Sequence, residues 1–547
     1  MSESEPATML CVPIMVQGLE QALSQCVQAA EQGADLVEFR IDSFTSEPDG
    51  VRLLVERAVL PCIVTCRLAS EGGEYDGDEQ TRISVLEHAC LGARQPAYLD
   101  VELAAYQSSA NLRQKIHLVV DNPDHRDRSR RVTTGLILSS HDFIQRPADL
   151  DRKVLAMAST PAARVIKVAW LARSLRDNVQ AFELIEQRYK PTVALCMGEA
   201  GLASRVLARK FGALLTFASL SRERETAPGQ PTVDELKKLY RWDAVTRSTR
   251  VYGVIGDPVG HSLSPHIHNA GFDATGYDGV YLPMPIPPAY EHFKATVGEW
   301  LAHKPLDFRG ASVTIPHKAN LLRFVQENKG EIEPLALRIG VANTLAVRDD
   351  GSLYACNTDY AAALDSVCDR MGVGREQLKN VKVAVLGAGG AARAIVAGFA
   401  DQGARVQIYN RTVERAQQLA DDFGDLSEIT AHPLDAAADS DANILINCTS
   451  IGMHPHVDAS PLPAAMPAFL PGAGAALPGA GVVFDTIYNP RKTLLLKQAE
   501  RAGCMTIAGT EMFVRQGARQ FALWTQQPAP LDVFREVLDR RLGEAGV

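Results

Sequence analysis

Short apolar runs rich in β-branched residues alternate with stretches of helical periodicity through the first 217 residues of the chain. Runs of about four to eight such residues are typical of buried strands, and their alternation with helices is typical of parallel α/β folds. Strands are expected at 9–14, 36–42, 62–67, 97–103, 136–140, 164–169, 192–197 and 214–217. Eight strands separated by helices favour a (β/α)8 barrel, with a doubly wound open sheet as the alternative.

A second α/β region follows residues 240–250, which lack apolar periodicity and are expected to form a short linker. A new strand is expected at 251–256, and residues 379–411 hold a strand, a glycine turn, a helix and a strand. Residues 461–481 are almost all Pro, Ala and Gly, which predicts an extended loop. The charge-dense segment 121–131 predicts a solvated loop. At roughly 100–200 residues per domain, 547 residues leave room for three or four domains.

Composition narrows the class of protein. The chain is 46% hydrophobic and 22% charged, and no apolar run approaches the roughly 18 residues that span a bilayer, so a soluble globular protein is expected. The net charge of −9 argues against a nucleic-acid partner. Ten dispersed cysteines without a C-x-x-C pair predict reduced thiols, with neither disulfides nor a structural metal. The short, acidic stretch 1–8 resembles neither a signal nor a transit peptide, which predicts a disordered cap on a cytoplasmic protein.

Several charged residues stand at or near the carboxyl ends of the first eight expected strands, where barrel enzymes place their catalytic groups. They are Glu38, Arg40 and Asp42 on the second strand, Arg67 closing the third, His141 after the fifth, Lys167 within the sixth and Arg205 after the seventh. Burial drives a lysine towards the neutral, nucleophilic amine. A lone lysine is more often an edge-strand side chain that reaches solvent. With a histidine to move protons and arginines to hold a carboxylate, the set instead indicates a Schiff-base lyase or aldolase acting on an anionic keto acid.

The same region resembles the type I 3-dehydroquinate dehydratases over residues 9–235. The matching motifs keep the family's order: VEFRID at 37–42, TCR at 65–67, EGGE at 71–74, SHDF at 140–143, IK at 166–167, MG at 197–198, SR at 204–205 and TAPGQ at 226–230. The resemblance implies that Lys167 forms the Schiff base, that His141 is the general acid and base, and that Glu71 orients and polarises His141. It also implies ligands for the substrate's hydroxyls and carboxylate at Glu38, Arg40, Arg67, Arg205, Thr226 and Gln230. Thr226 stands where bacterial relatives commonly have serine, and it keeps the hydroxyl.

The second half holds a candidate dinucleotide-binding turn. The run VKVAVLGAGGAAR at 381–393 reads as a strand, a glycine turn and the start of a helix, where glycines let the backbone approach a pyrophosphate. The next strand, at 405–409, ends about twenty residues later, where the residue that reads the ribose is expected. Asn410, Arg411 and Thr412 stand there, with Arg415 one turn on and no acidic residue. Arginines attract a 2′-phosphate that a carboxylate would repel, so NADP(H) is the expected cofactor.

Lys318 and Asp359 are the remaining candidates for chemistry, although each taken alone is more often a solvated surface charge. Their surroundings resemble the shikimate dehydrogenases over residues 251–540, which place a Lys–Asp pair at the reacting carbonyl. The matching motifs are GVIGDPVGHSLSP at 253–265, SVTIPHK at 312–318, NT at 343–344, NTD at 357–359, NCTSIGM at 447–453, DTIYNP at 485–490 and GTEM at 509–512. The resemblance implies proton transfer by Lys318 and Asp359. It implies hydroxyl and carboxylate ligands at Ser262, Ser264, Thr314, Asn343, Tyr488 and Gln516, and cofactor contacts at Gly387, Ala388, Gly389, Gly390, Ala391, Asn410, Arg411, Thr412, Arg415, Gly509 and Met512.

The two resemblances together predict an α/β protein in which an N-terminal TIM (β/α)8 barrel precedes a two-lobed dehydrogenase. The expected boundaries are a barrel at 1–242, a linker at 243–250, a substrate-binding lobe at 251–362 completed by 511–547, and a Rossmann lobe at 363–510. The expected substrates are 3-dehydroquinate, 3-dehydroshikimate and shikimate, with no nucleic acid or membrane as partner. Two alternatives stay open: a dehydrogenase that prefers quinate, and a regulatory protein that keeps the folds as metabolite-binding modules.

Overall fold

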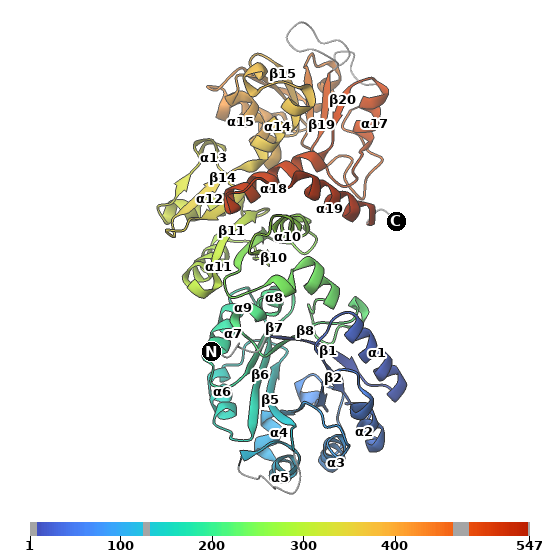
Figure 1. Ribbon diagram of the computed structural model, residues 1–547. Helices are drawn as coiled ribbons and strands as arrows, with labels where there is room; N and C mark the ends of the chain where they lie inside the picture. Colours follow the sequence, from blue (N-terminus) through green and yellow to red (C-terminus); the bar gives the residue numbers. More distant parts are fainter. Residues whose placement is uncertain (1–7, 124–131, 463–480, 545–547) are drawn as a thin grey trace. The chain divides into compact units, whose positions relative to one another are not determined.

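The computed structural model describes residues 8–123, 132–462 and 481–544 (Figure 1). The chain forms two compact units. The first comprises Met1–Arg250, Asp278–Ile286 and Ala295–Asp307, and the second Val251–Tyr277, Pro287–Lys294 and Phe308–Val547. The sequence-based interpretations of 1–7, of 124–131 and of 463–480 fall outside the described residues.

The first unit is built on eight parallel strands that follow each other in space in chain order. Each of the eight expected strands is present: β1 Met9–Met15, β2 Leu36–Arg40, β3 Cys62–Thr65, β4 Tyr98–Glu102, β5 Gly135–Asp142, β6 Ala163–Leu171, β7 Thr192–Met197 and β8 Leu215–Phe217. β1 pairs with both β2 and β8, so the last strand of the series lies beside the first. Between β7 and β8, the Leu214 amide donates to the Thr192 carbonyl at 2.9 Å. The expected barrel is therefore confirmed.

Helices lie around the outside of these strands (Figure 1). They are α1 Leu19–Glu31, α2 Pro48–Arg57, α3 Glu79–Ala89, α4 Leu103–Ser108, α5 Ala110–Val119, α6 Leu150–Ala158, α7 Asp177–Glu186, α8 Leu202–Val206 and α9 Ala208–Phe211. Inside, period-2 alternation along β6 puts Val165, Lys167 and Ala169 on one face. Val165 and Ala169 belong to the same buried apolar cluster, so Lys167 stands between two apolar inward positions of the barrel.

Four of the charged residues noted in the first half differ in place from the sequence-based expectation. Asp42 lies beyond the end of β2, which ends at Arg40. Arg67 lies beyond the end of β3, because the pairing of that strand with its neighbours stops at Thr65. His141 lies inside β5 rather than after it, because the ladder with β6 continues to Asp142. Arg205 lies on the short helix α8 instead of directly after β7.

Residues 240–250 were expected to be a linker, but the segment up to Thr249 packs against the barrel. Tyr240 and Trp242 are buried. The ammonium of Lys210 donates to the carbonyls of Arg247 and Thr249, both at 2.8 Å. Buried aromatic residues without periodic spacing give no strand or helix signal, which is why the sequence pattern here looked like a linker.

The second unit contains two sheets. In the first, the strands are hydrogen-bonded in the order β9 Arg250–Gly256, β11 Phe308–Val313, β13 Thr344–Val347, β14 Leu353–Cys356 and β12 Glu331–Ile332. The pairs of β13 with β11 and of β13 with β14 are antiparallel. Its helices are α10 Ser264–Thr275, α12 Lys318–Glu327, α13 Pro334–Ile339 and α14 Thr358–Met371. Two further elements occur in this part of the sequence: β10 Gly279–Pro285 belongs to the first unit, and the residues of α11 Tyr290–Ala302 are divided between the two units.

The other sheet is parallel throughout, with the order β17-β16-β15-β18-β19-β20. This order, 3-2-1-4-5-6, is that of the Rossmann fold, and it confirms the expected nucleotide-binding lobe. Its elements are β15 Lys382–Leu386, α15 Gly390–Asp401, β16 Arg405–Asn410, α16 Val413–Phe423, β17 Ile429–Pro433, β18 Ile444–Asn447, β19 Val482–Asp485, α17 Leu494–Arg501 and β20 Met505–Ile507. Helices α18 Gly509–Thr525 and α19 Leu531–Glu544 follow, and α18 returns to pack on β11, β13 and α14.

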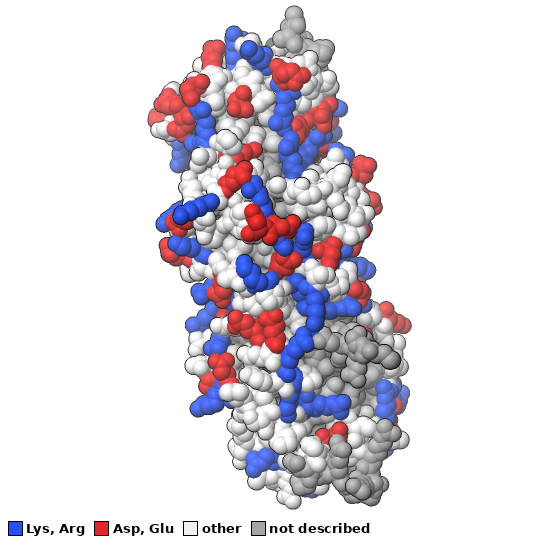
Figure 2. Space-filling model, turned by 60° about the vertical axis from the view of Figure 1, so that its left-hand side comes forward, with Lys and Arg blue, Asp and Glu red and all other residues white. Residues whose placement is uncertain are grey.

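Two surface properties bear on the expected partners. In the part of the chain that the structure describes, no helix has both the length and the apolar character needed to cross a membrane. On the face shown in Figure 2, acidic and basic side chains are largely interspersed.

Candidate active sites

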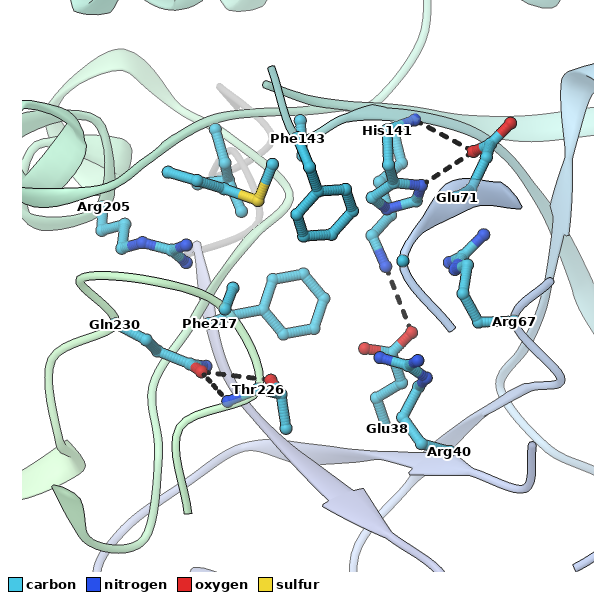
Figure 3. Close-up of a pocket in the computed structure, with 16 residues that line it drawn as sticks. Glu38, Arg40, Arg67, Glu71, His141, Phe143, Arg205, Phe217, Thr226 and Gln230 are labelled. Carbon is cyan, nitrogen blue, oxygen red and sulfur yellow. Dashed lines mark hydrogen bonds and ion pairs between the residues drawn. The ribbon is translucent and has the colours of Figure 1, made fainter. Parts of the chain in front are cut away.

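The carboxyl ends of the barrel strands enclose a pocket that collects every residue expected for the first site (Figure 3). Its lining consists of Glu38, Arg40, Arg67, Glu71, Gly72, His141, Phe143, Lys167, Ala169, Leu195, Met197, Arg205, Phe217, Thr226, Ala227 and Gln230. Inward positions at strand ends converge in a barrel, which explains how residues so far apart in sequence meet.

Lys167 enters this pocket from β6 and is only 5% exposed. Its Nζ lies 3.1 Å from Oε1 of Glu38 and 2.8 Å from Oδ2 of Asp100. It also lies 4.6 Å from the centre of the Phe217 ring. A buried ammonium needs paired charge, and the two carboxylates supply it. Once it has lost a proton, the same amine is a nucleophile that faces the pocket.

Asp100 joins Lys167 to Arg67. Its Oδ1 lies 2.9 Å from Nη2 of Arg67 and accepts a 2.5 Å hydrogen bond from the Ser139 hydroxyl. Burial alone would raise the pKa of Asp100, but the charges of Arg67 and Lys167 outweigh it and hold the pKa well below its usual range. Asp100 is therefore an anion at neutral pH and holds both cations in place.

His141 is fixed by one carboxylate. Oε2 of Glu71 lies 3.0 Å from both the backbone N and Nδ1 of His141 (Figure 3). Burial lowers the pKa of His141 well below its usual value, and the charges of Arg67 and Lys167 lower it further. The imidazole is therefore neutral at pH 7. With Nδ1–H donating to Glu71, Nε2 is the nitrogen that accepts a proton.

Arg205 is a buried cation whose surroundings suit an anion. It is 2% exposed, and its Nε has no hydrogen-bond partner among the described residues. Burial lowers the pKa of Arg205 to about 10, a shift that nearby Cys196 and Glu225 offset only in part. A buried guanidinium with an unused donor is costly unless a ligand supplies the acceptor.

Two further expected ligands are held by neighbours within the pocket. Oε1 of Gln230 accepts hydrogen bonds from the backbone N and the hydroxyl of Thr226, at 3.0 and 3.1 Å (Figure 3). Nη2 of Arg40 lies 2.6 Å from Oδ2 of Asp42. Both contacts fix side chains that carry hydrogen-bond donors at the pocket wall.

The second unit holds a second pocket, which collects the residues expected for a substrate hydroxy acid. It is lined by Val254, Pro258, Val259, His261, Ser262, Ser264, Ser312, Val313, Thr314, Lys318, Asn343, Asp359, Thr486, Tyr488, Gly509, Met512, Phe513, Gln516 and Gln520. Lys318 and Asp359 therefore face the same cavity as the serines, Thr314, Asn343 and Gln516.

Lys318 and Asp359 form an ion pair in this cavity. Nζ of Lys318 lies 2.5 Å from Oδ2 of Asp359, and Oδ1 of Asp359 accepts from the Asn343 amide at 2.9 Å. Asp359 lies in the first turn of α14, where Asn357 caps the helix by accepting from the Asp359 amide at 3.0 Å. Each oxygen of Asp359 thus has its own donor.

The glycine turn between β15 and α15 leaves open space at a helix N-terminus. Gly387 has φ of +106°, which only glycine adopts without strain. A Cβ placed on Gly389 or Gly390 would meet no atom within 4 Å. A pocket here is lined by Ala388, Gly389, Gly390, Arg393, Arg415, Gln418 and Leu419. The other expected cofactor residues do not line it: Gly387, Ala391, Asn410, Arg411 and Thr412.

Comparison with known proteins identifies both units. Residues 10–247 match the type I 3-dehydroquinase family, 254–345 the shikimate dehydrogenase substrate binding domain, 372–465 the shikimate/quinate 5-dehydrogenase family and 509–538 the shikimate 5′-dehydrogenase C-terminal domain. A bifunctional 3-dehydroquinate dehydratase/shikimate dehydrogenase from Arabidopsis thaliana, described as chloroplastic, is 35% identical over 97% of this chain and 84% of its own. The chain belongs to this bifunctional family.

Two relatives of the dehydrogenase unit are of similar length to that unit. The NADP(+) shikimate dehydrogenase of Methanothermobacter thermautotrophicus is 40% identical and covers 54% of this chain and 99% of its own. The solved shikimate 5-dehydrogenase of Thermus thermophilus, in complex with NADP(H) and shikimate, is 32% identical over 53% of this chain and 99% of its own, with a TM-score of 0.44.

The cofactor of the dehydrogenase unit is NADP(H), and the described residues fit it. The open backbone at Gly389 and Gly390 gives a pyrophosphate room at the N-terminus of α15. Arg415 lines the same pocket and carries the charge that a 2′-phosphate needs. Gly509 and Met512 line the pocket that holds Lys318 and Asp359.

Several residues at the two sites escaped the sequence reasoning. In the dehydratase barrel, Asp100 and Glu102 alternate along β4, and this period-2 spacing of two carboxylates was an available signal. In the dehydrogenase unit, Gln520 accepts from Ser312 at 2.7 Å and donates to Thr344 at 2.9 Å. Gln520 stands one helical turn after Gln516 on α18, so helical spacing indicated that both share a face.

Proposed function

We propose that Lys167 and His141 dehydrate 3-dehydroquinate to 3-dehydroshikimate in the barrel, and that Lys318 and Asp359 serve the reduction of 3-dehydroshikimate to shikimate in the second unit. The observation that carries the proposal is that the groups needed for each reaction meet in one pocket. A buried lysine, a neutral histidine and an unsatisfied arginine share one pocket, and a Lys–Asp pair shares another with hydroxyl and amide groups. The product of the first reaction is the ketone that the second reduces.

Dehydration begins at Lys167. Its neutral Nζ attacks the ketone carbon of 3-dehydroquinate, and water leaves as the protonated imine forms. The iminium acidifies the adjacent C–H, from which Nε2 of His141 removes the proton to give an enamine. His141 then returns that proton to the hydroxyl on the β-carbon, which departs as water. Hydrolysis of the conjugated imine releases 3-dehydroshikimate and restores Lys167.

The remaining pocket residues hold the substrate. Arg205, whose Nε has no partner in the part of the chain that the structure describes, is placed to bind the carboxylate, and Thr226 and Gln230 lie in the same pocket. Glu38, Arg40 and Arg67 would bind hydroxyls. Glu71 keeps His141 in the tautomer that the proton transfers need.

In the dehydrogenase unit, the ketone oxygen must gain a proton while its carbon gains a hydride. The chemistry that NADPH supplies when bound is the hydride. Lys318 is placed to donate the proton at the ketone oxygen, and Asp359, 2.5 Å from Nζ, to hold and then replenish it. The other polar residues of the pocket would hold hydroxyls and carboxylate: Ser262, Ser264, Thr314, Asn343, Tyr488 and Gln516.

Trapping the imine tests the dehydratase assignment. Borohydride added with 3-dehydroquinate should reduce the imine and add a ligand mass to the peptide that contains Lys167. The Lys167→Met protein serves as the control and should stay unlabelled. An unlabelled Lys167 peptide in the unchanged protein would refute the Schiff-base role.

Kinetics of Lys318→Met test the dehydrogenase assignment. Loss of the proton donor should lower kcat by about 100-fold or more while KM for shikimate changes little. An unchanged kcat would remove Lys318 from the chemistry. The same assay compares shikimate with quinate, and a higher kcat/KM for quinate would reassign the substrate. Ser264, which lines the pocket, is the residue expected to favour shikimate.

We further propose the domain limits 1–242, 251–362 with 511–547, and 363–510, and a cytoplasmic location. The family matches at 10–247 and 254–345 support the first boundary. Ten cysteines present as thiols support a reducing compartment. Limited proteolysis between 243 and 250 and cell fractionation test these two points.

A further inference from the structure

A fully buried ion pair lies behind the dehydratase pocket. Arg82, from α3, is 2% exposed and forms an ion pair with Oε2 of Glu102 at the end of β4, which is itself fully buried. Nε of Arg82 also donates to the carbonyl of Cys66 at 3.0 Å. Neither Arg82 nor Glu102 lines the pocket. A charged pair this deep is expensive to bury.

The second oxygen of Glu102 reaches the catalytic groups. Oε1 accepts from Nη1 of Arg67 and from the Leu68 amide, both at 3.1 Å. Arg67 binds Asp100 through Nη2 at 2.9 Å, and Asp100 binds Lys167 at 2.8 Å. Charges therefore alternate without a break from α3 to the amine that forms the imine.

We infer that Arg82 and Glu102 are a positioning pair for the dehydratase: they hold Arg67 against Asp100 and set how firmly Asp100 retains the ammonium of Lys167. The inference rests on the proposed role of Lys167. If Arg67 were released from Glu102, it would be free to move closer to Asp100 or away from it, and the share of the Asp100 charge left for Lys167 would change. In a buried setting such changes are weakly screened.

Other charged and titratable groups also face Lys167 or the pocket that it enters. They are Cys11 on β1, Glu38 and Arg40 on β2, Arg67 after β3, Glu71 on the turn that follows, Asp100 on β4, His141 on β5 and Arg205 on α8. All of them stay unchanged when only Arg82 or Glu102 is substituted. A shift in Lys167 reactivity then reports the pair itself.

The test compares Glu102→Gln with Arg82→Met in the full chain. Each substitution breaks the same ion pair, so any general loss of structure should affect both variants alike. Their electrostatic effects on Lys167 have opposite signs, because one removes a negative charge and the other a positive charge. The readout is the pH midpoint at which cyanoborohydride and 3-dehydroquinate label the Lys167 peptide. Loss of the negative charge disfavours the ammonium, so Glu102→Gln should move the midpoint down by about one pH unit. Arg82→Met should move it up by a similar amount.

The double variant and a surface control complete the design. Arg82→Met with Glu102→Gln leaves the charge unchanged, so the midpoint should return towards that of the parent protein, while kcat/KM stays lowered by about tenfold because Arg67 has lost its anchor. Such neutral replacements of buried pairs commonly fold well. Glu87→Gln removes a partly exposed carboxylate of α3, paired with Lys115, and should leave the midpoint unchanged.

The outcomes distinguish the proposed Schiff-base role of Lys167 from the inferred role of Arg82 and Glu102. No labelled Lys167 in the parent protein would refute the proposed function itself. Labelling with the same midpoint in all variants, or a shift of the same sign in both single variants, would refute the positioning pair alone. If a single variant fails to fold, Arg82→Lys, which keeps the charge, should keep the parent midpoint but lower kcat/KM, and a shifted midpoint there would also overturn the inference.

Discussion

Glu71 accepts both the backbone N–H and the ring Nδ1–H of His141 on a single oxygen, Oε2, at 3.0 Å each. One carboxylate thereby fixes the backbone of β5 at its end and the tautomer of the imidazole. The arrangement makes proton transfer at Nε2 depend on the ionisation of Glu71.

The pH dependence of the dehydratase follows from this contact. Burial raises the pKa of Glu71 to about 7. As the pH falls through this value the carboxylate is protonated and no longer stabilises the imidazolium, so kcat should fall on the acid side of about pH 7. Glu71→Gln removes the ionisation: kcat should drop by about 100-fold and lose this acid limb. The absorbance of the enone product, followed across pH, measures both. An acid limb that persists in the variant would assign the ionisation to another group.

Arg205 is expected to lower the stability of the ligand-free barrel and to strengthen its binding of 3-dehydroquinate. Its charge is buried and no described residue pairs with Nε, so Arg205→Gln removes a desolvation cost from the ligand-free protein. We expect the Tm of the barrel to stay level or rise, while KM for 3-dehydroquinate rises by about 100-fold through loss of the carboxylate contact. Calorimetry and steady-state kinetics on the same preparation check the pair of effects. A lower Tm with an unchanged KM would make Arg205 a structural residue.

The sequence predicted the residues that line the barrel pocket better than the charged residues that lie behind them. Lys167 stands out because a cation interrupts an apolar strand, and His141 because a resemblance extends through its motif. Arg82 gives no such signal: it sits in the polar run 79–82 at the start of α3, and only the packing of α3 against the strands buries it. Residues 240–249 were read as a linker for the same reason, since burial of Trp242 depends on tertiary contacts alone.

The open backbone at Gly389 predicts a selective defect. Its φ is −88° and an added Cβ meets nothing within 4 Å, so Gly389→Ala should fold with unchanged or slightly raised stability. The methyl group would occupy the space through which the backbone approaches a pyrophosphate, so KM for NADPH should rise by about tenfold or more. Dehydratase activity of the same chain is the internal control. Unchanged KM for NADPH would place the cofactor elsewhere.

Arg415 should govern the choice between the two nicotinamide cofactors. It lines the pocket beside the glycine turn, and sequence places no acidic residue at the end of β16. Arg415→Gln should raise KM for NADPH by about tenfold and leave KM for NADH nearly unchanged, because only NADPH carries the 2′-phosphate. Steady-state kinetics with both cofactors measure the ratio. An equal rise for both would mean that Arg415 contacts a part they share.

The central claim is that one chain carries two independent catalytic centres, one at Lys167 and one at the Lys318–Asp359 pair. The direct test assays enone formation from 3-dehydroquinate and NADPH consumption with 3-dehydroshikimate, separately, in Lys167→Met and Lys318→Met. We predict that the first variant loses enone formation and keeps NADPH consumption, and that the second does the reverse. Loss of both activities in either variant, or full retention of both, would contradict the account.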